Sequence, residues 1–293
     1  GWSGVRRRID ASIARWRGDG DGDAGRVEYL EALAGVLGLI QERIGEYADR
    51  AEALAVECPD SDADVPEFRE IARIARRLVS EPPATFREAL QWYWFFVTFE
   101  RSTSSGNGAF RLDQVLLPYY RGDLAAGRID AQRAIELLAA LFLKEGLFYC
   151  LGGVDAEGRD AVNELSLLAL RAYDTIGGPS NLNVRWHPGI DSRFFAYALD
   201  LLRRRRSGVP LLVNDEVVIP SLVHFGVPLR EARGYAFSGC FWWVVPGKEY
   251  PYHDMEAVSG TRMLAETLRR AFRDPPLTFE ALQGRACIGG GGA

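Results

Sequence analysis

The stretch that decides the fold reads Asn-Leu-Asn-Val-Arg-Trp-His-Pro-Gly over residues 181–189. Its first six residues are predicted to form a strand, and from there strands and helices alternate along the chain. The predicted order is a helix over 192–206, a strand over 209–213, a helix near 217–225 and a strand over 234–237. Alternation of this kind indicates parallel strands joined by helical crossovers, so the predicted fold class is α/β.

The residues before this stretch are predicted to be mainly helical. Apolar side chains recur at helical spacing between residues 26 and 56, which indicates one long amphipathic helix. Further helices are expected over about 68–78, behind a Thr85 and Glu88 capping box, behind an Asp130 cap, and over about 161–175. Residues 111–120, which contain Pro118, are expected to be irregular.

The change of pattern predicts three parts: a mainly helical part at 1–178, a strand and helix part at 179–274, and a tail at 275–293. The chain opens at Gly1 without an initiator methionine and closes on a glycine run. We therefore expect a fragment with a truncated end.

The composition suits a globular protein and argues against a nucleic-acid or membrane protein. The 293 residues are 47% apolar and 26% charged, with a formal charge of -5, so neither nucleic acid nor an anionic membrane is an expected partner. The longest apolar run, near 92–99, is too short to span a bilayer. Four widely spaced cysteines and three histidines without an HExxH motif predict no metal site, and reduced thiols in the cytoplasm.

Cys240 is the candidate for chemistry. It follows a predicted strand, lies between Gly239 and three aromatic residues, and could be held at a loop tip in a water-poor cavity. In parallel α/β sheets the working residues collect where strands end. The alternative is a buried structural cysteine, because free cysteine behaves as a small hydrophobe.

Five segments, in order, resemble those of glycyl radical enzymes of the pyruvate formate-lyase-like group. They are Phe86–Trp92, Arg111–Gln114 with Leu117–Tyr120, Ser180–Gly189, Asn214–Pro220 and Ser238–Cys240. The resemblance implies that the helical N-terminal part is followed by part of a ten-stranded α/β barrel, with the cysteine on a loop inside it. It also implies a thiyl radical on Cys240, for which apolar burial is suitable, whereas a thiolate would want positive charge beside it.

The resemblance further implies a homodimer and a radical S-adenosylmethionine activase that installs a glycyl radical on a C-terminal domain. No cofactor is expected on this chain itself. No segment matches the family's Arg-Val-x-Gly-Tyr-like radical motif, so we expect the radical domain to lie outside the chain, in cis or on another polypeptide.

The surroundings of Cys240 depart from the family pattern. Trp242 stands where many members carry a glutamate, and Gly239 does not supply the Cys-Cys pair of pyruvate formate-lyase. We assign proton transfer to Asp254 and Glu249 instead. For Asp254, the alternative is a helix N-cap.

Four residues are predicted to contact substrate: Ser180, Asn183, Arg185 and Trp242. For Ser180 and Asn183 the alternative is hydrogen bonding at a strand edge. For Arg185 it is an ion pair with Asp215 or Glu216.

The resemblance implies an enzyme of anaerobic metabolism that cleaves a C–C, C–O or C–N bond of a small metabolite, in the cytoplasmic setting that the cysteines suggest. Two alternatives remain open. One is a non-catalytic remnant or accessory fragment that lacks the radical glycine, and the other is a thiolate-dependent hydrolase or transferase.

Overall fold

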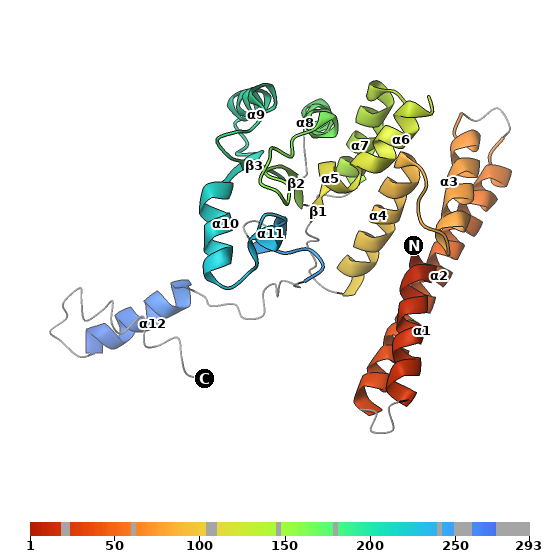
Figure 1. Ribbon diagram of the computed structural model, residues 1–293, viewed down its shortest axis with the longest axis horizontal. Helices are drawn as coiled ribbons and strands as arrows, with labels where there is room; N and C mark the ends of the chain where they lie inside the picture. The colour runs from red at the N-terminus through yellow and green to blue at the C-terminus, as the bar shows by residue number, and fades with distance from the viewer. Residues whose placement is uncertain are drawn as a thin grey trace. The chain divides into compact units, whose positions relative to one another are not determined.

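The structure is a computed structural model that describes residues 1–18, 24–59, 63–103, 110–144, 148–177, 181–238, 242–248 and 260–273 (Figure 1). The chain divides into two compact units, residues 1–251 and 252–293. The second unit contains one described helix, α12 (Gly260–Arg273). The fold and the candidate site below belong to the first unit.

Three helices begin the first unit: α1 (Trp2–Gly18), α2 (Ala24–Glu57) and α3 (Val65–Leu78). Figure 1 shows α1 lying along α2, and buried side chains such as Ile44, Ile74 and Leu78 form their shared core. The predicted helices over 26–56 and 68–78 are confirmed. The sequence analysis missed α1, because its buried Trp2 and Ile9 stand among arginines that hide the helical spacing.

The helix α4 (Phe86–Thr103) begins where the capping box was predicted. Thr85 Oγ1 accepts from the Glu88 N–H at 3.2 Å, as expected, while the Glu88 carboxylate accepts from the Ala84 N–H at 2.8 Å. The irregular segment predicted over 111–120 was wrong. Those residues enter α5 (Leu112–Val115) and α6 (Leu117–Ala125), since Pro118 falls in the first turn of α6, where a missing N–H is tolerated.

A parallel sheet follows, in the order β1-β2-β3-β4. Its strands are β1 (Phe110–Arg111), β2 (Phe148–Gly152), β3 (Asn181–Trp186) and β4 (Leu211–Asn214). The helices between and after them are α7 (Ala131–Lys144), α8 (Glu164–Ile176), α9 (Ser192–Arg205), α10 (Asp215–His224) and α11 (Leu229–Ala232). The predicted parallel pairing through helical crossovers is confirmed for β3 and β4, which α9 connects.

The final predicted strand has a different partner from the one its place in the alternation suggested. Strand β5 (Ala236–Ser238) pairs antiparallel with β6 (Trp242–Val244), and the two form a separate hairpin. The parallel sheet therefore stops at β4 among the described residues.

The two faces of the sheet are chemically different. On one face Tyr149, Leu151, Leu182 and Val184 pack against α7, α8 and α9 in the largest apolar core. On the other face Cys150 packs with residues of α10, α11 and β5. Figure 1 shows α8 and α9 on the opposite side of the strands from α10 and α11, and this second face is the one that β5 contacts.

Substitutions of two leucines on α7 test whether the apolar core lies where the structure shows it. Leu138 is fully buried, whereas Leu143 is 61% exposed. We expect Leu138→Ala to lower the free energy of unfolding by about 2–5 kcal/mol, because it leaves a cavity, and Leu143→Ala to change it by less than about 0.5 kcal/mol. Urea unfolding measures both values, and equal losses would contradict the burial pattern.

Candidate active site

The second face of the sheet carries a row of polar side chains. Arg111, Cys150 and Asn183 are register partners on β1, β2 and β3, so their side chains project from the same face. The next row on this face pairs Gly152 of β2 with Arg185 of β3. The face therefore presents two guanidinium groups, a thiol and an amide within two rows.

Strand β5 lies against this face. It contacts β1 and β2, and its residues Ala236 and Phe237 share an apolar cluster with Cys150. Positions 239–241 connect β5 to β6, so Cys240 is two residues beyond the end of β5.

Arg185 joins the residues just before β5 to the parallel sheet. Its Nε and Nη2 donate to the two carboxylate oxygens of Asp215, each at 2.8 Å, and neither side chain is more than 2% exposed. The same guanidinium donates to the backbone carbonyls of Tyr235 at 2.9 Å and Arg233 at 3.0 Å. A charged group this deeply buried is tolerated because its N–H groups have acceptors.

The guanidinium of Arg185 is also enclosed from both sides. Its Cζ lies 3.8 Å from the centre of the Tyr235 ring. On the β2 side, a Cβ added to Gly153 would lie 2.5 Å from the Arg185 Nε, so only glycine leaves room for it. Asp215 in turn accepts from the Tyr235 hydroxyl at 2.6 Å and the Val154 N–H at 3.1 Å. We call Arg185, Asp215, Tyr235 and Gly153 the arginine clamp.

A second set of bonds fixes the end of β2. Arg111 Nη2 donates to the carbonyls of Gly152 at 2.9 Å and Val154 at 3.2 Å. The Asp113 carboxylate accepts from the Gly152 N–H at 2.8 Å and from the Ser166 hydroxyl at 2.5 Å. Burial raises the pKa of Asp113, and these two donors oppose that rise.

Asn183 contrasts with these paired groups. Its side chain is fully buried, yet neither its amide nitrogen nor its amide oxygen has a hydrogen-bond partner in the part of the chain that the structure describes. The Nε of Arg111, two strands away in the same row, is also without one there. Buried polar groups are rarely left unpaired, so Asn183 marks a position that calls for an explanation.

Cys150 is not a nucleophile at this face. Burial raises the pKa of its thiol to about 11, and the nearby guanidinium groups of Arg185 and Arg111 only partly counter that effect. At neutral pH the group is therefore a neutral thiol beneath β5.

The comparisons with known proteins decide the family. The model of the protein family described as "Pyruvate formate lyase-like" matches residues 1–274. The chain belongs to this family. The Escherichia coli (strain K12) protein named "Probable dehydratase YbiW" is 31% identical over 249 residues, which cover 75% of this chain and 30% of that protein. The isethionate sulfite-lyase of Nitratidesulfovibrio vulgaris is 32% identical over 242 residues, which cover 72% of this chain and 28% of that enzyme.

The solved structures agree with the family assignment. A Roseburia inulinivorans structure described by its 1,2-propanediol dehydration superposes with a TM-score of 0.83 at 26% identity, covering 98% of this chain and 40% of that one. Glycyl radical dehydratases and lyases are among the relatives. The predicted fold, a helical N-terminal part followed by part of a glycyl radical enzyme barrel, is thus confirmed. The chain spans about 30% of the length of the curated relatives it matches.

The structure describes only some of the predicted site residues. Ser180, Cys240, Glu249 and Asp254 lie outside the described residues, and of Trp242 only the backbone in β6 is described. Asn183 and Arg185 lie two residues apart on β3 and project from the polar face. For Arg185, the ion pair with Asp215 is the arrangement that forms.

Several residues that build this site were not singled out by the sequence analysis. Asp113 and Tyr235 had no signal of their own, because a buried acid or tyrosine is recognisable only once its partners are in place. Gly153 sits in a Gly-Gly pair, a pattern that marks a turn without showing what the turn packs against.

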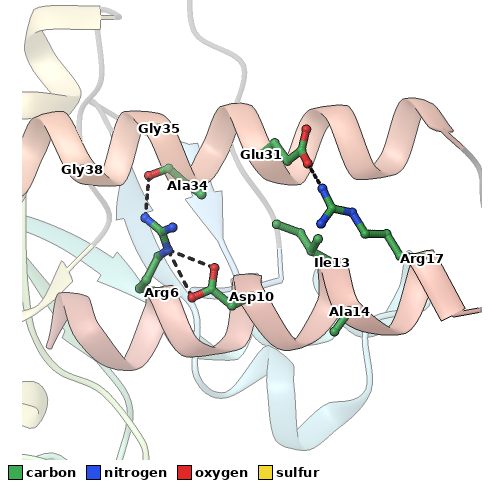
Figure 2. Close-up of a pocket in the computed structure, with 9 residues that line it drawn as sticks. All are labelled: Arg6, Asp10, Ile13, Ala14, Arg17, Glu31, Ala34, Gly35 and Gly38. Atoms are coloured by element: carbon green, nitrogen blue, oxygen red, sulfur yellow. Dashed lines mark hydrogen bonds and ion pairs between the residues drawn. The ribbon is translucent and has the colours of Figure 1, made fainter.

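The structure also contains a groove between α1 and α2, far along the chain from the predicted site residues (Figure 2). Arg6 pairs with Asp10 at 3.0 Å and Arg17 pairs with Glu31, so the charged side chains that line it neutralise one another. We assign no chemistry to it. Within the described ranges there is no group of three or more metal-ligating side chains, and no helix there is long and apolar enough to cross a membrane.

Gly153 provides a test of the clamp geometry. Its φ is +76°, so an alanine there would suffer both left-handed backbone strain and a clash with Arg185. Gly208 has nearly the same φ, +77°, with open space around it. We expect Gly208→Ala to cost about 1–2 kcal/mol of unfolding free energy and Gly153→Ala about 2–5 kcal/mol. Thermal or urea unfolding compares the two, and equal costs would show that Arg185 is not packed against Gly153.

Proposed function

We propose that this chain is the cysteine-bearing part of a glycyl radical lyase or dehydratase in which Cys240 forms a thiyl radical. The observation that carries the proposal is that β5, which ends two residues before Cys240, lies on the polar face of a sheet in a chain that matches the family over residues 1–274. Phe237 before this position and Val244 after it are buried and apolar, while Trp243 is 44% exposed. Such surroundings suit a neutral thiol and a thiyl better than a thiolate, which needs positive charge nearby.

The proposed chemistry is redox-neutral within one turnover. The glycyl radical domain, in cis or in trans, supplies the one-electron reactivity that takes the hydrogen atom from the Cys240 thiol. Cys240 then takes a hydrogen atom from a substrate carbon, which allows the neighbouring C–C, C–O or C–N bond to break. Cys240 returns a hydrogen atom to the product radical, and the thiyl that re-forms takes back the hydrogen atom from the glycine, so no external oxidant or reductant is consumed.

Proton transfer to the leaving group is assigned to Glu249 and Asp254, because Trp242 cannot provide it. Ser180, Asn183 and Trp242 are proposed to line the substrate site. The buried amide of Asn183, without a partner among the described residues, supports this for one of them, since a substrate hydroxyl can accept from its amide nitrogen and donate to its amide oxygen. We also propose a small polar substrate, a homodimer, a radical S-adenosylmethionine activase as partner, and an anaerobic, cytoplasmic setting.

Electron paramagnetic resonance tests the reaction type. The protein is expressed from its complete gene and incubated anaerobically with the activase and S-adenosylmethionine. We expect a glycyl radical doublet in the wild type and in Cys240→Ala, but loss of turnover only in the latter, because the thiyl forms after the glycyl radical. The matched control is Cys58→Ala, a partly exposed cysteine beyond α2 that should leave both signals unchanged.

Two outcomes would favour the alternatives. Absence of the doublet in every preparation supports a non-catalytic remnant or accessory fragment. Rapid stoichiometric alkylation of Cys240 by iodoacetamide in the native protein supports a thiolate-dependent hydrolase or transferase.

Asn183 allows function to be separated from stability. Asn183→Leu removes an unpaired buried amide, so we expect the free energy of unfolding to rise by about 1–3 kcal/mol while kcat/KM falls by about tenfold to a hundredfold. The matched control is Asn163→Leu. The Asn163 amide oxygen accepts from the Leu165 N–H at 2.9 Å as an N-cap, so this variant should lose about 0.5–2 kcal/mol. A loss of stability in Asn183→Leu would instead assign Asn183 a structural role.

A further inference from the structure

We propose that Arg185 is a positioning residue, which fixes β5 on the sheet by binding the backbone at its base and thereby sets the position of the segment that carries Cys240. The inference deepens the proposed function and rests on it for the role of Cys240. The binding of β5 itself is argued from the described residues alone.

The hairpin that flanks Cys240 has little support of its own. It contains three residue pairs, Ala236 with Val244, Phe237 with Trp243 and Ser238 with Trp242. A two-stranded hairpin of this length is at best marginally stable in water, so its position must be set by what it rests on.

Arg185 supplies that support through two backbone contacts. The carbonyls of Arg233 and Tyr235 both accept from its guanidinium, one from Nη2 and one from Nη1. Because these carbonyls belong to alternate residues immediately before β5, the two bonds fix the direction of the chain as well as its distance from β3. The Tyr235 side chain adds a third attachment through its ring and its hydroxyl bond to Asp215.

Arginine is the side chain that this geometry requires. Its planar fork spans both Asp215 oxygens and two carbonyls at once, while its flat face fits between Gly153 and the Tyr235 ring. A lysine could keep the charge, but it could not reach all four acceptors or stack in the same slot. Because four of its N–H groups have acceptors within the protein and its side chain is fully buried, we assign Arg185 a role through β5 and not through contact with the substrate.

Cys150 reports directly on whether β5 is in place. It is covered by the cluster that contains Ala236 and Phe237, and its neutral thiol should resist alkylation as long as that cover holds. Release of β5 uncovers Cys150, while Cys58 beyond α2 is unaffected.

The test compares Arg185→Met and Arg185→Lys with two controls. Arg204→Met breaks an arginine–aspartate pair of the same 2.8 Å length, which joins Arg204 on α9 to Asp174 on α8. Leu138→Ala destabilises the apolar core on the other face of the sheet. Each protein is labelled with N-ethylmaleimide under native conditions, the labelled cysteines are identified by peptide mass spectrometry, and the unfolding free energy is measured by urea. After anaerobic activation, the glycyl radical yield, kcat and KM are measured on the same proteins.

We expect Arg185→Met to raise the labelling rate of Cys150 by about tenfold or more beyond a Leu138→Ala variant of equal stability loss, with Cys58 unchanged. We expect kcat to fall by about tenfold to a hundredfold with the radical yield and KM largely retained, since a displacement of about 1 Å is enough for such a loss. Arg185→Lys should lie between this variant and the wild type, and Arg204→Met should match the wild type.

Labelling that rises only in proportion to the lost stability, as in Leu138→Ala, would overturn the proposal and leave Arg185 a general structural residue. An increase in KM with kcat unchanged would overturn it in favour of direct substrate binding. If Arg185→Met does not fold, Arg185→Lys carries the same comparison. If no glycyl radical forms in any variant, the proposed function fails, while the labelling results still decide whether Arg185 holds β5.

Discussion

The buried ion pair between Arg185 and Asp215 is the interaction on which the polar face of this protein depends. Removing two charges from water costs several kcal/mol for each, and their mutual attraction repays that cost only when the remaining donors and acceptors are also satisfied. Here Asp215 receives the arginine, a tyrosine hydroxyl and a backbone N–H, and Arg185 reaches two further carbonyls. The pair is therefore tolerable only with β2, β3, α10 and β5 all in place, which couples four elements at one point.

This coupling explains how one sheet can have two such different faces. The face toward α7, α8 and α9 is held by apolar burial, which is strong but not directional. The other face is held by hydrogen bonds of fixed geometry, such as those from Arg111 to the carbonyls that end β2. Apolar burial selects which residues lie inside, and the directional bonds determine where β5 lies on the strands beneath it.

The sequence predicted the elements with strong local signals. The long amphipathic α2, the Asp130 cap of α7 and the β3, α9, β4 crossover follow from periodicity and capping chemistry within a few turns of chain. Strand β2 was missed, because its five residues are all buried and show no alternation, and β1 has only two residues. Such strands are defined by their neighbours in the sheet, and no local pattern marks them.

The candidate site, too, could be predicted from the sequence only in part. The family-like order of segments pointed to Cys240 and to β3, and in the structure Arg185 of β3 binds the backbone of the residues that lead to β5. The choice between a substrate contact and an ion pair for Arg185 could not be made from sequence, because Asp215 is thirty residues away and Tyr235 fifty. Both alternatives use the same charge, and only the sheet register brings the partners together.

Asn183 and Arg185 lie close together on one strand but differ in whether their polar atoms have hydrogen-bond partners. They stand two residues apart on β3 and face the same side, yet the four donor contacts of Arg185 are made within the protein, whereas the amide of Asn183 has no partner among the described residues. A buried amide without partners lowers the free energy of unfolding by about 1–3 kcal/mol. The protein has asparagine at this position although leucine has a similar volume and would not carry this cost. Arg185 is bound within the protein, whereas the amide of Asn183 could form hydrogen bonds with the substrate in the proposed function.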